Sequence, residues 1–139
     1  MSSEQPNSGA LTGRRAFLLG FPLLLALSPL GCSTTSTGSL SSPTDFPKVF
    51  EACKLAVVDA GFGLTAASSA EGFISGQRGV WGGVGVYIMN VHVARKGAET
   101  SVHANVVPPA GDIGETRSYI KAFSNALRNR VPDVAVVGF

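Results

Sequence analysis

Hydrophobic and polar residues divide the chain into three stretches with different patterns. A nearly continuous apolar run covers residues 16–31, a run of Ser, Thr and Gly follows it, and periodic apolar positions continue to the end of the chain. The polar run has no apolar period and too little hydrophobic surface to offset the entropy of ordering it. The pattern therefore predicts a leader over 1–31, a flexible tether over 32–44 and a single domain over 45–139, which is expected to fold without the residues before it.

Two segments of this domain repeat their apolar residues with the period of an amphipathic helix. The first is "DFPKVFEACKLAVVDAGF", which Thr44 or Asp45 is expected to cap and Gly61 to end in a left-handed conformation. The second lies in "TRSYIKAFSNALRNRVPD" and ends before Pro132. The expected buried faces are Phe46, Val49, Phe50, Cys53, Val57 and Ala60 in the first helix, and Tyr119, Ile120, Phe123, Leu127 and Val131 in the second.

Between the two helices the apolar period drops to two, which predicts strands near 62–66, 72–79, 84–95 and 99–107. Gly97 and Ala98 suit a two-residue hairpin loop between the last two strands. If the apolar residues of both strands face one core, Val93 lies opposite Val102, and His92 lies opposite His103 on the other face. The predicted fold is an α+β two-layer sandwich, with two helices on one face of an antiparallel four-stranded sheet. The tail, 133–139, is compatible with a short edge strand or with a packed tail.

The charge of the chain is low and balanced, with 11 Lys and Arg against 9 Asp and Glu. Two of these basic residues and one acidic residue precede Cys32, which leaves 9 and 8 after it, or a net charge of +1. Such a domain lacks the basic footprint of a nucleic-acid-binding protein, so nucleic acid is not an expected partner.

The leader has the order of an export signal, with a polar start, two arginines, an apolar run and small residues. "RRAFL", containing Arg14 and Arg15, resembles the twin-arginine export signal. "PLGCS" resembles a lipobox, although the lipobox pattern has Leu where this chain has Pro29. The resemblance implies lipidation of Cys32 and a membrane-anchored protein of the cell envelope that faces the periplasm, at the outer membrane if the cell is Gram-negative. The alternative is an uncleaved signal anchor, although the 16-residue run is shorter than the about 20 residues of a spanning helix.

The glycine-rich segment "GVWGGVG" lies between two predicted strands, whereas a phosphate-binding loop precedes a helix. A hairpin connection is therefore the expected structure. Trp81 at its tip is a possible contact for a membrane interface or a partner, or it folds back onto the end of the sheet.

His92 and His103 are weak candidates for metal ligands, because a zinc site needs three or four ligands and no carboxylate lies beside them in the strands. Cys53 fits a core position, and it is a candidate for a disulfide with Cys32 only if Cys32 carries no lipid. No combination of nucleophile, base and orienting group is apparent, so we expect no catalytic residue, no cofactor and no enzymatic activity.

The helix ending in "DAGF", the segment "AEGFISGQ", the strand "ETSVHANVV" and the closing helix resemble small bacterial envelope lipoproteins of unknown function with a compact α-β-β-β-α domain. They are also loosely similar to the helix-grip domains of BamC, an accessory lipoprotein of outer-membrane protein assembly. The likeness implies an envelope location and a non-enzymatic role. By elimination among the functions considered, we expect a lipid-anchored binding or assembly module with an envelope protein as partner. The alternatives are a carrier of a small apolar ligand and a metal-binding protein that uses the two histidines.

Overall fold

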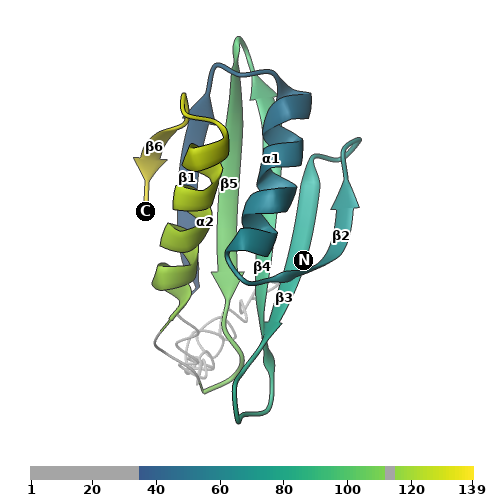
Figure 1. Cartoon of the computed structure of the whole chain (residues 1–139), viewed down its shortest axis with the longest axis vertical. Coiled ribbons are helices and arrows are strands. Elements are labelled where there is room, and N and C mark those ends of the chain that lie inside the picture. Colours follow the sequence, from purple (N-terminus) through teal and green to yellow (C-terminus); the bar gives the residue numbers. More distant parts are fainter. Residues whose placement is uncertain (1–34, 112–114) are drawn as a thin grey trace, which may run out of the picture. The chain divides into compact units, whose positions relative to one another are not determined.

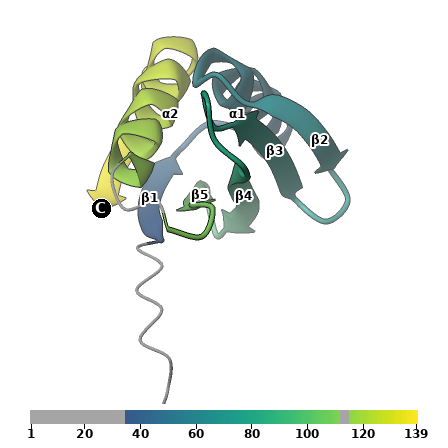
Figure 2. The ribbon, with the colours of Figure 1, turned by 90° about the horizontal axis from the view of Figure 1, so that it is seen from below.

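The fold is a two-layer α+β sandwich, described by a computed structural model for residues 35–111 and 115–139. Its elements are β1 (Ser36–Ser42), α1 (Phe46–Asp59), β2 (Gly63–Ser68), β3 (Phe73–Gly79), β4 (Val86–Lys96), β5 (Glu99–Val107), α2 (Thr116–Arg130) and β6 (Ala135–Gly138). The strands form one antiparallel sheet in the order β2-β3-β4-β5-β1-β6. Both helices cover the same face of this sheet (Figures 1 and 2). The predicted fold class is therefore confirmed.

The prediction of four strands is wrong, because the sheet has six. The first additional strand, β1, is formed by residues that the Ser, Thr and Gly composition assigned to a flexible tether. It pairs with β5 along all seven of its residues and with β6 on its other side. Only one large apolar side chain, Leu40, marks the buried face of β1, so no hydrophobic period was visible. Backbone hydrogen bonds to two neighbours order this segment in place of side-chain burial.

Gly38 explains part of the unusual composition of β1. A Cβ atom at this position would lie 2.8 Å from Cγ2 of Ile120, so a small residue is needed where α2 packs against the strand. Polar side chains of β1 also have partners, since Oγ of Ser36 lies 2.7 Å from Oγ1 of Thr116 at the start of α2. The second additional strand, β6, shows that the tail is a short edge strand.

Both helices bury the faces that their periodicity predicts. The backbone N–H groups of Gly61 and Phe62 donate to the carbonyl oxygens of Val58 and Val57, and Gly61 has φ +90°. This is the expected left-handed end of α1, with Phe62 returning to the core. Asp45 occupies the N-cap position of α1, but its side chain makes no capping hydrogen bond, so that part of the prediction is wrong.

The register of the β4–β5 hairpin agrees with the prediction. Val93 pairs with Val102 and His92 pairs with His103. Strand β4 ends at Lys96 and β5 begins at Glu99, so the hairpin loop has two residues, and Gly97 has φ +67°. The two valines are buried under the helices, while both histidines are exposed on the opposite face. Burial of one apolar face thus determined the pairing.

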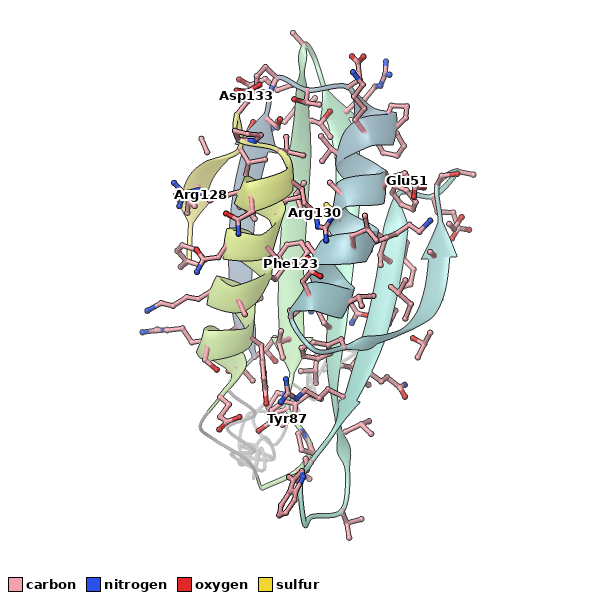
Figure 3. The ribbon with its side chains drawn as sticks, viewed as in Figure 1. Glu51, Tyr87, Phe123, Arg128, Arg130 and Asp133 are labelled. Atoms are coloured by element: carbon pink, nitrogen blue, oxygen red, sulfur yellow. The ribbon has the colours of Figure 1, made fainter. Side chains whose placement is uncertain are left out.

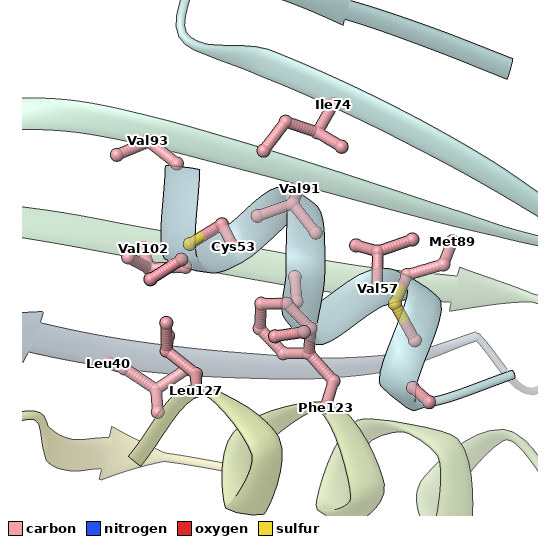
Figure 4. Close-up of a cluster of buried hydrophobic side chains, with 14 of the residues drawn as sticks. Leu40, Cys53, Val57, Ile74, Met89, Val91, Val93, Val102, Phe123 and Leu127 are labelled. Carbon is pink, nitrogen blue, oxygen red and sulfur yellow. The ribbon is translucent and has the colours of Figure 1, made fainter. Parts of the chain in front are cut away.

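The core lies between the sheet and the two helices, and side chains from both layers fill it (Figure 4). Phe123 of α2 is fully buried in the middle of this core, and Leu40 of β1 belongs to the same cluster of side chains. Each such side chain contributes about 1.5–3 kcal/mol relative to an exposed position. The other large side chains that are almost completely buried are Phe62, Ile74, Met89, Ile120, Leu127, Val49, Val57, Val91, Val102 and Val106.

Candidate functional site

The residues predicted for export and lipidation, Arg14, Arg15 and Cys32, lie outside the described residues. Their roles therefore stay predictions. Neither helix of the described residues is long and apolar enough to span a membrane. The structure does place the other predicted residues, which are the two histidines, Cys53 and Trp81.

His92 and His103 lie side by side on the sheet face that the helices leave uncovered. Oγ of Ser39 on β1 lies 2.9 Å from Nδ1 of His103, and the ring of Phe73 on β3 is 5.1 Å from the ring of His92. A shallow hollow of about 320 Å³ next to the pair is lined by residues of β1, β4 and β5. The imidazole of His103 therefore contacts a serine hydroxyl and that of His92 contacts a phenyl ring, and neither group is a typical metal ligand.

A metal site at the histidines would need ligands from elsewhere. Among residues 35–111 and 115–139, no group of three or more His, Cys, Asp and Glu side chains converges so as to hold a metal ion. Asn90 and Asn105 pair with each other next to the histidines, and neutral amide groups are weak ligands for zinc. A hydroxyl group, a phenyl ring and two amides do not complete a tetrahedral zinc site around the two histidines.

Cys53 is completely buried on the inner face of α1. Burial in these apolar surroundings raises the pKa of its thiol to about 12. The uncharged thiol is a poor nucleophile, since the thiolate is the reactive form. The structure thus agrees with a core position for Cys53, and the alternative of a disulfide to Cys32 involves a residue outside the described residues.

The loop between β3 and β4, residues 80–85, carries the most exposed apolar side chains among the described residues. Trp81 is 102% exposed and Val84 is 101% exposed. The loop is closed by a hydrogen bond from the N–H of Val80 to the carbonyl of Gly85, 3.3 Å long. The two glycines at 82 and 85 have φ of +71° and +125°, conformations that are strained for other residues. Because its side chain is fully exposed, Trp81 does not fold back onto the sheet. The segment is a hairpin connection, as expected.

A cleft of about 660 Å³ opens beside this loop, a volume within the range of ligand-binding sites. Tyr87 lies near the same end of the sheet, away from the middle of α2 where Phe123 packs (Figure 3). We call this site the loop-end cleft. Its lining residues are Arg78, Gly79, Val80, Trp81, Tyr87, Glu115 and Tyr119.

The polar groups of the loop-end cleft are arranged around Tyr119 of α2. The guanidinium carbon of Arg78 lies 5.0 Å from the centre of the Tyr119 ring, and the Tyr119 hydroxyl donates a 2.7 Å hydrogen bond to Oε2 of Glu115. The ring of Tyr87 meets that of Tyr119 edge-on at 5.0 Å. Nη1 of Arg78 also donates to the carbonyl of Ala60, 3.4 Å away. These contacts hold the guanidinium group, the carboxylate and the two aromatic rings in fixed positions at this end of the sandwich.

Sequence reasoning singled out Trp81 as a contact residue and assigned Tyr119 to the buried face of the second helix, but it predicted no site that joins Arg78, Glu115 and Tyr119. These three residues belong to β3, to the cap of α2 and to its first turns, and they are separated by up to 41 positions in the chain. No local pattern marks residues that only the packing of a helix against a sheet end brings together.

Comparison with known proteins adds no family to this description. No family model matches the chain, and no curated protein matches it either. The resemblance to BamC-like envelope lipoproteins therefore stays a prediction that rests on sequence patterns alone.

Proposed function

We propose that this protein is an exported, lipid-anchored module of the cell envelope, and that it acts by binding and not by catalysis. The end of the sandwich that carries the 80–85 loop and the loop-end cleft is its binding surface. The observation that carries the proposal is the complete exposure of Trp81. An exposed side chain of this size stabilises the fold little, and the equally exposed Val84 of the same loop adds a second apolar side chain to the surface.

The anchoring part of the proposal is tested by the mass of the protein in the membrane fraction. The chain should begin at Cys32 and carry acyl groups, and the Cys32→Ala variant should lack them. Recovery of only the full-length, unmodified chain would contradict lipidation and favour a signal anchor.

The binding part is tested by a photo-reactive amino acid in place of Val84, with the same amino acid in place of Leu55 as a control. Leu55 is apolar and 48% exposed, but it lies on the outer face of α1. Adducts from position 84 in cells, in excess of those from position 55, support a binding surface at the loop. Equal yields from the two positions would refute it.

A small ligand in the loop-end cleft is a second candidate function. The volume of about 660 Å³ supports it, but Arg78 and Glu115 in the lining favour a ligand with polar groups over the purely apolar ligand suggested by the sequence. A metal-binding role at His92 and His103 stays the least supported alternative, because the described residues bring no further strong ligand to them.

A further inference from the structure

The start of β1 limits how far the domain can lie from a lipid on Cys32. The chain enters the sheet at Ser36, so three residues separate the two positions instead of the longer tether that composition predicted. Four steps of fully extended chain span at most about 14 Å. If Cys32 is acylated, as in the proposed function on which this inference rests, the end of the sandwich at Ser36 is held close to the bilayer.

The strand register places the 80–85 loop at this same end of the sheet. Ser36 of β1 pairs with Val106 of β5, which pairs with Met89 of β4. Val86, where β4 begins after the loop, is three residues further along the strand, or about 10 Å at the usual rise per residue. In Figure 1 the start of β1 and the β3–β4 loop both lie at the lower end of the domain, and the loop reaches further down. The start of β1 and the 80–85 loop therefore lie at the same end of the sheet.

The side chains on the loop suit the boundary between lipid and water. Trp81 has an apolar ring with a polar N–H group, the combination that is enriched at membrane interfaces, and Val84 adds a second exposed apolar side chain to the same loop. Residues 79–86 contain no charged side chain. A charged side chain in this segment would oppose entry of the loop into the headgroup region. Two exposed arginines, Arg78 on β3 and Arg117 in the first turn of α2, belong to elements that meet at this end.

We infer that the partner of the loop is the surface of the bilayer that holds the acylated Cys32, and that Trp81 and Val84 insert into it. The domain is then fixed by two contacts, a covalent one through the acyl groups and a non-covalent one through the loop. These two contacts restrict the orientation of the domain. The strands stand at a steep angle to the membrane plane, and the sheet face that carries His92 and His103 is directed parallel to that plane. A single acyl chain binds weakly and several bind well, so the loop orients the domain more than it holds it.

Trp81 is the only tryptophan of the chain, so its fluorescence reports on this loop alone. The experiment uses the protein purified from membranes and reconstituted in phosphatidylcholine vesicles with bromine on the lipid acyl chains, which quenches tryptophan on contact. We expect emission at shorter wavelength than in detergent-free buffer and strong quenching by bromine. The Val84→Asp variant should lose most of the quenching, and the matched Leu55→Asp variant on α1 should retain it. Circular dichroism of both variants checks that they remain folded, which full exposure of Val84 predicts.

Absence of bromine quenching in the wild-type protein would overturn the inference. If the mass of the same preparation shows acyl groups on Cys32, that result would leave the proposed anchoring intact. Quenching without acylation would support insertion of the loop and refute the lipid anchor. Shielding of Trp81 only after envelope proteins are added would also overturn the inference, because it would assign the loop to a protein partner.

Discussion

The Leu40→Ala substitution tests whether β1 belongs to the folded domain. Leu40 is 1% exposed and is the one large apolar side chain of β1 in the core. The substitution removes three carbon atoms, which corresponds to about 2.4 kcal/mol of lost transfer free energy at about 0.8 kcal/mol for each carbon. The cavity that remains next to α2 adds to this cost, so we expect a loss of about 3–4 kcal/mol in the free energy of unfolding.

Urea unfolding followed by circular dichroism measures this loss as a lower midpoint at an unchanged slope. The control is Leu55→Ala, which makes the same chemical change at a side chain that is 48% exposed, and it should cost less than about 0.5 kcal/mol. Equal and small effects of the two substitutions would refute the assignment of β1 to the sheet and restore the flexible tether.

Shortening the chain tests the same assignment without altering a side chain in the core. A chain beginning at Ser42 retains every segment that the hydrophobic period predicts, but it lacks six of the seven residues of β1. It should not unfold cooperatively, because β5 loses one of its neighbours and β6 loses the strand on which it pairs. Cooperative unfolding at the midpoint of the full chain would contradict this reasoning.

Three further predictions concern the core and the uncovered sheet face. Phe123→Ala should lower the free energy of unfolding by about 3–5 kcal/mol in urea titrations, because the ring is fully buried between the layers. In the Cys32→Ala chain, Cys53 should not react with a thiol reagent at pH 8 until the protein unfolds, and its labelling by that reagent measures this. Because burial raises the pKa of Cys53 to about 12, the folded state keeps a proton that the unfolded chain loses near pH 9.0, so the free energy of unfolding should decrease as pH rises from 9.0 to about 12. Calorimetric titration with Zn²⁺ should show no binding tighter than micromolar at His92 and His103, and nanomolar affinity that is abolished by His103→Ala would make metal binding the leading function.

The sequence alone determined the two helices, the central hairpin and the fold class, because each of these depends on a period of apolar residues. The inner faces of both helices and the opposition of His92 and His103 follow from burial on one side of each element. The end of α1 at Gly61 was predictable for a different reason, since a left-handed residue before a returning Phe62 is a local requirement.

Only the tertiary structure decided the fate of residues 36–42 and the composition of the loop-end cleft. Strand β1 has one large buried apolar side chain, and it is ordered by hydrogen bonds to β5 and β6 and by the close approach of α2 at Gly38. The residues of β5 that pair with β1 lie 58 to 70 positions away in the chain, so no local pattern contains them. The same holds for Arg78, Glu115 and Tyr119, which meet because a helix packs on the end of a sheet. Apolar periodicity reports which face of an element is buried, whereas pairing of a polar strand and convergence of polar side chains depend on contacts between distant segments.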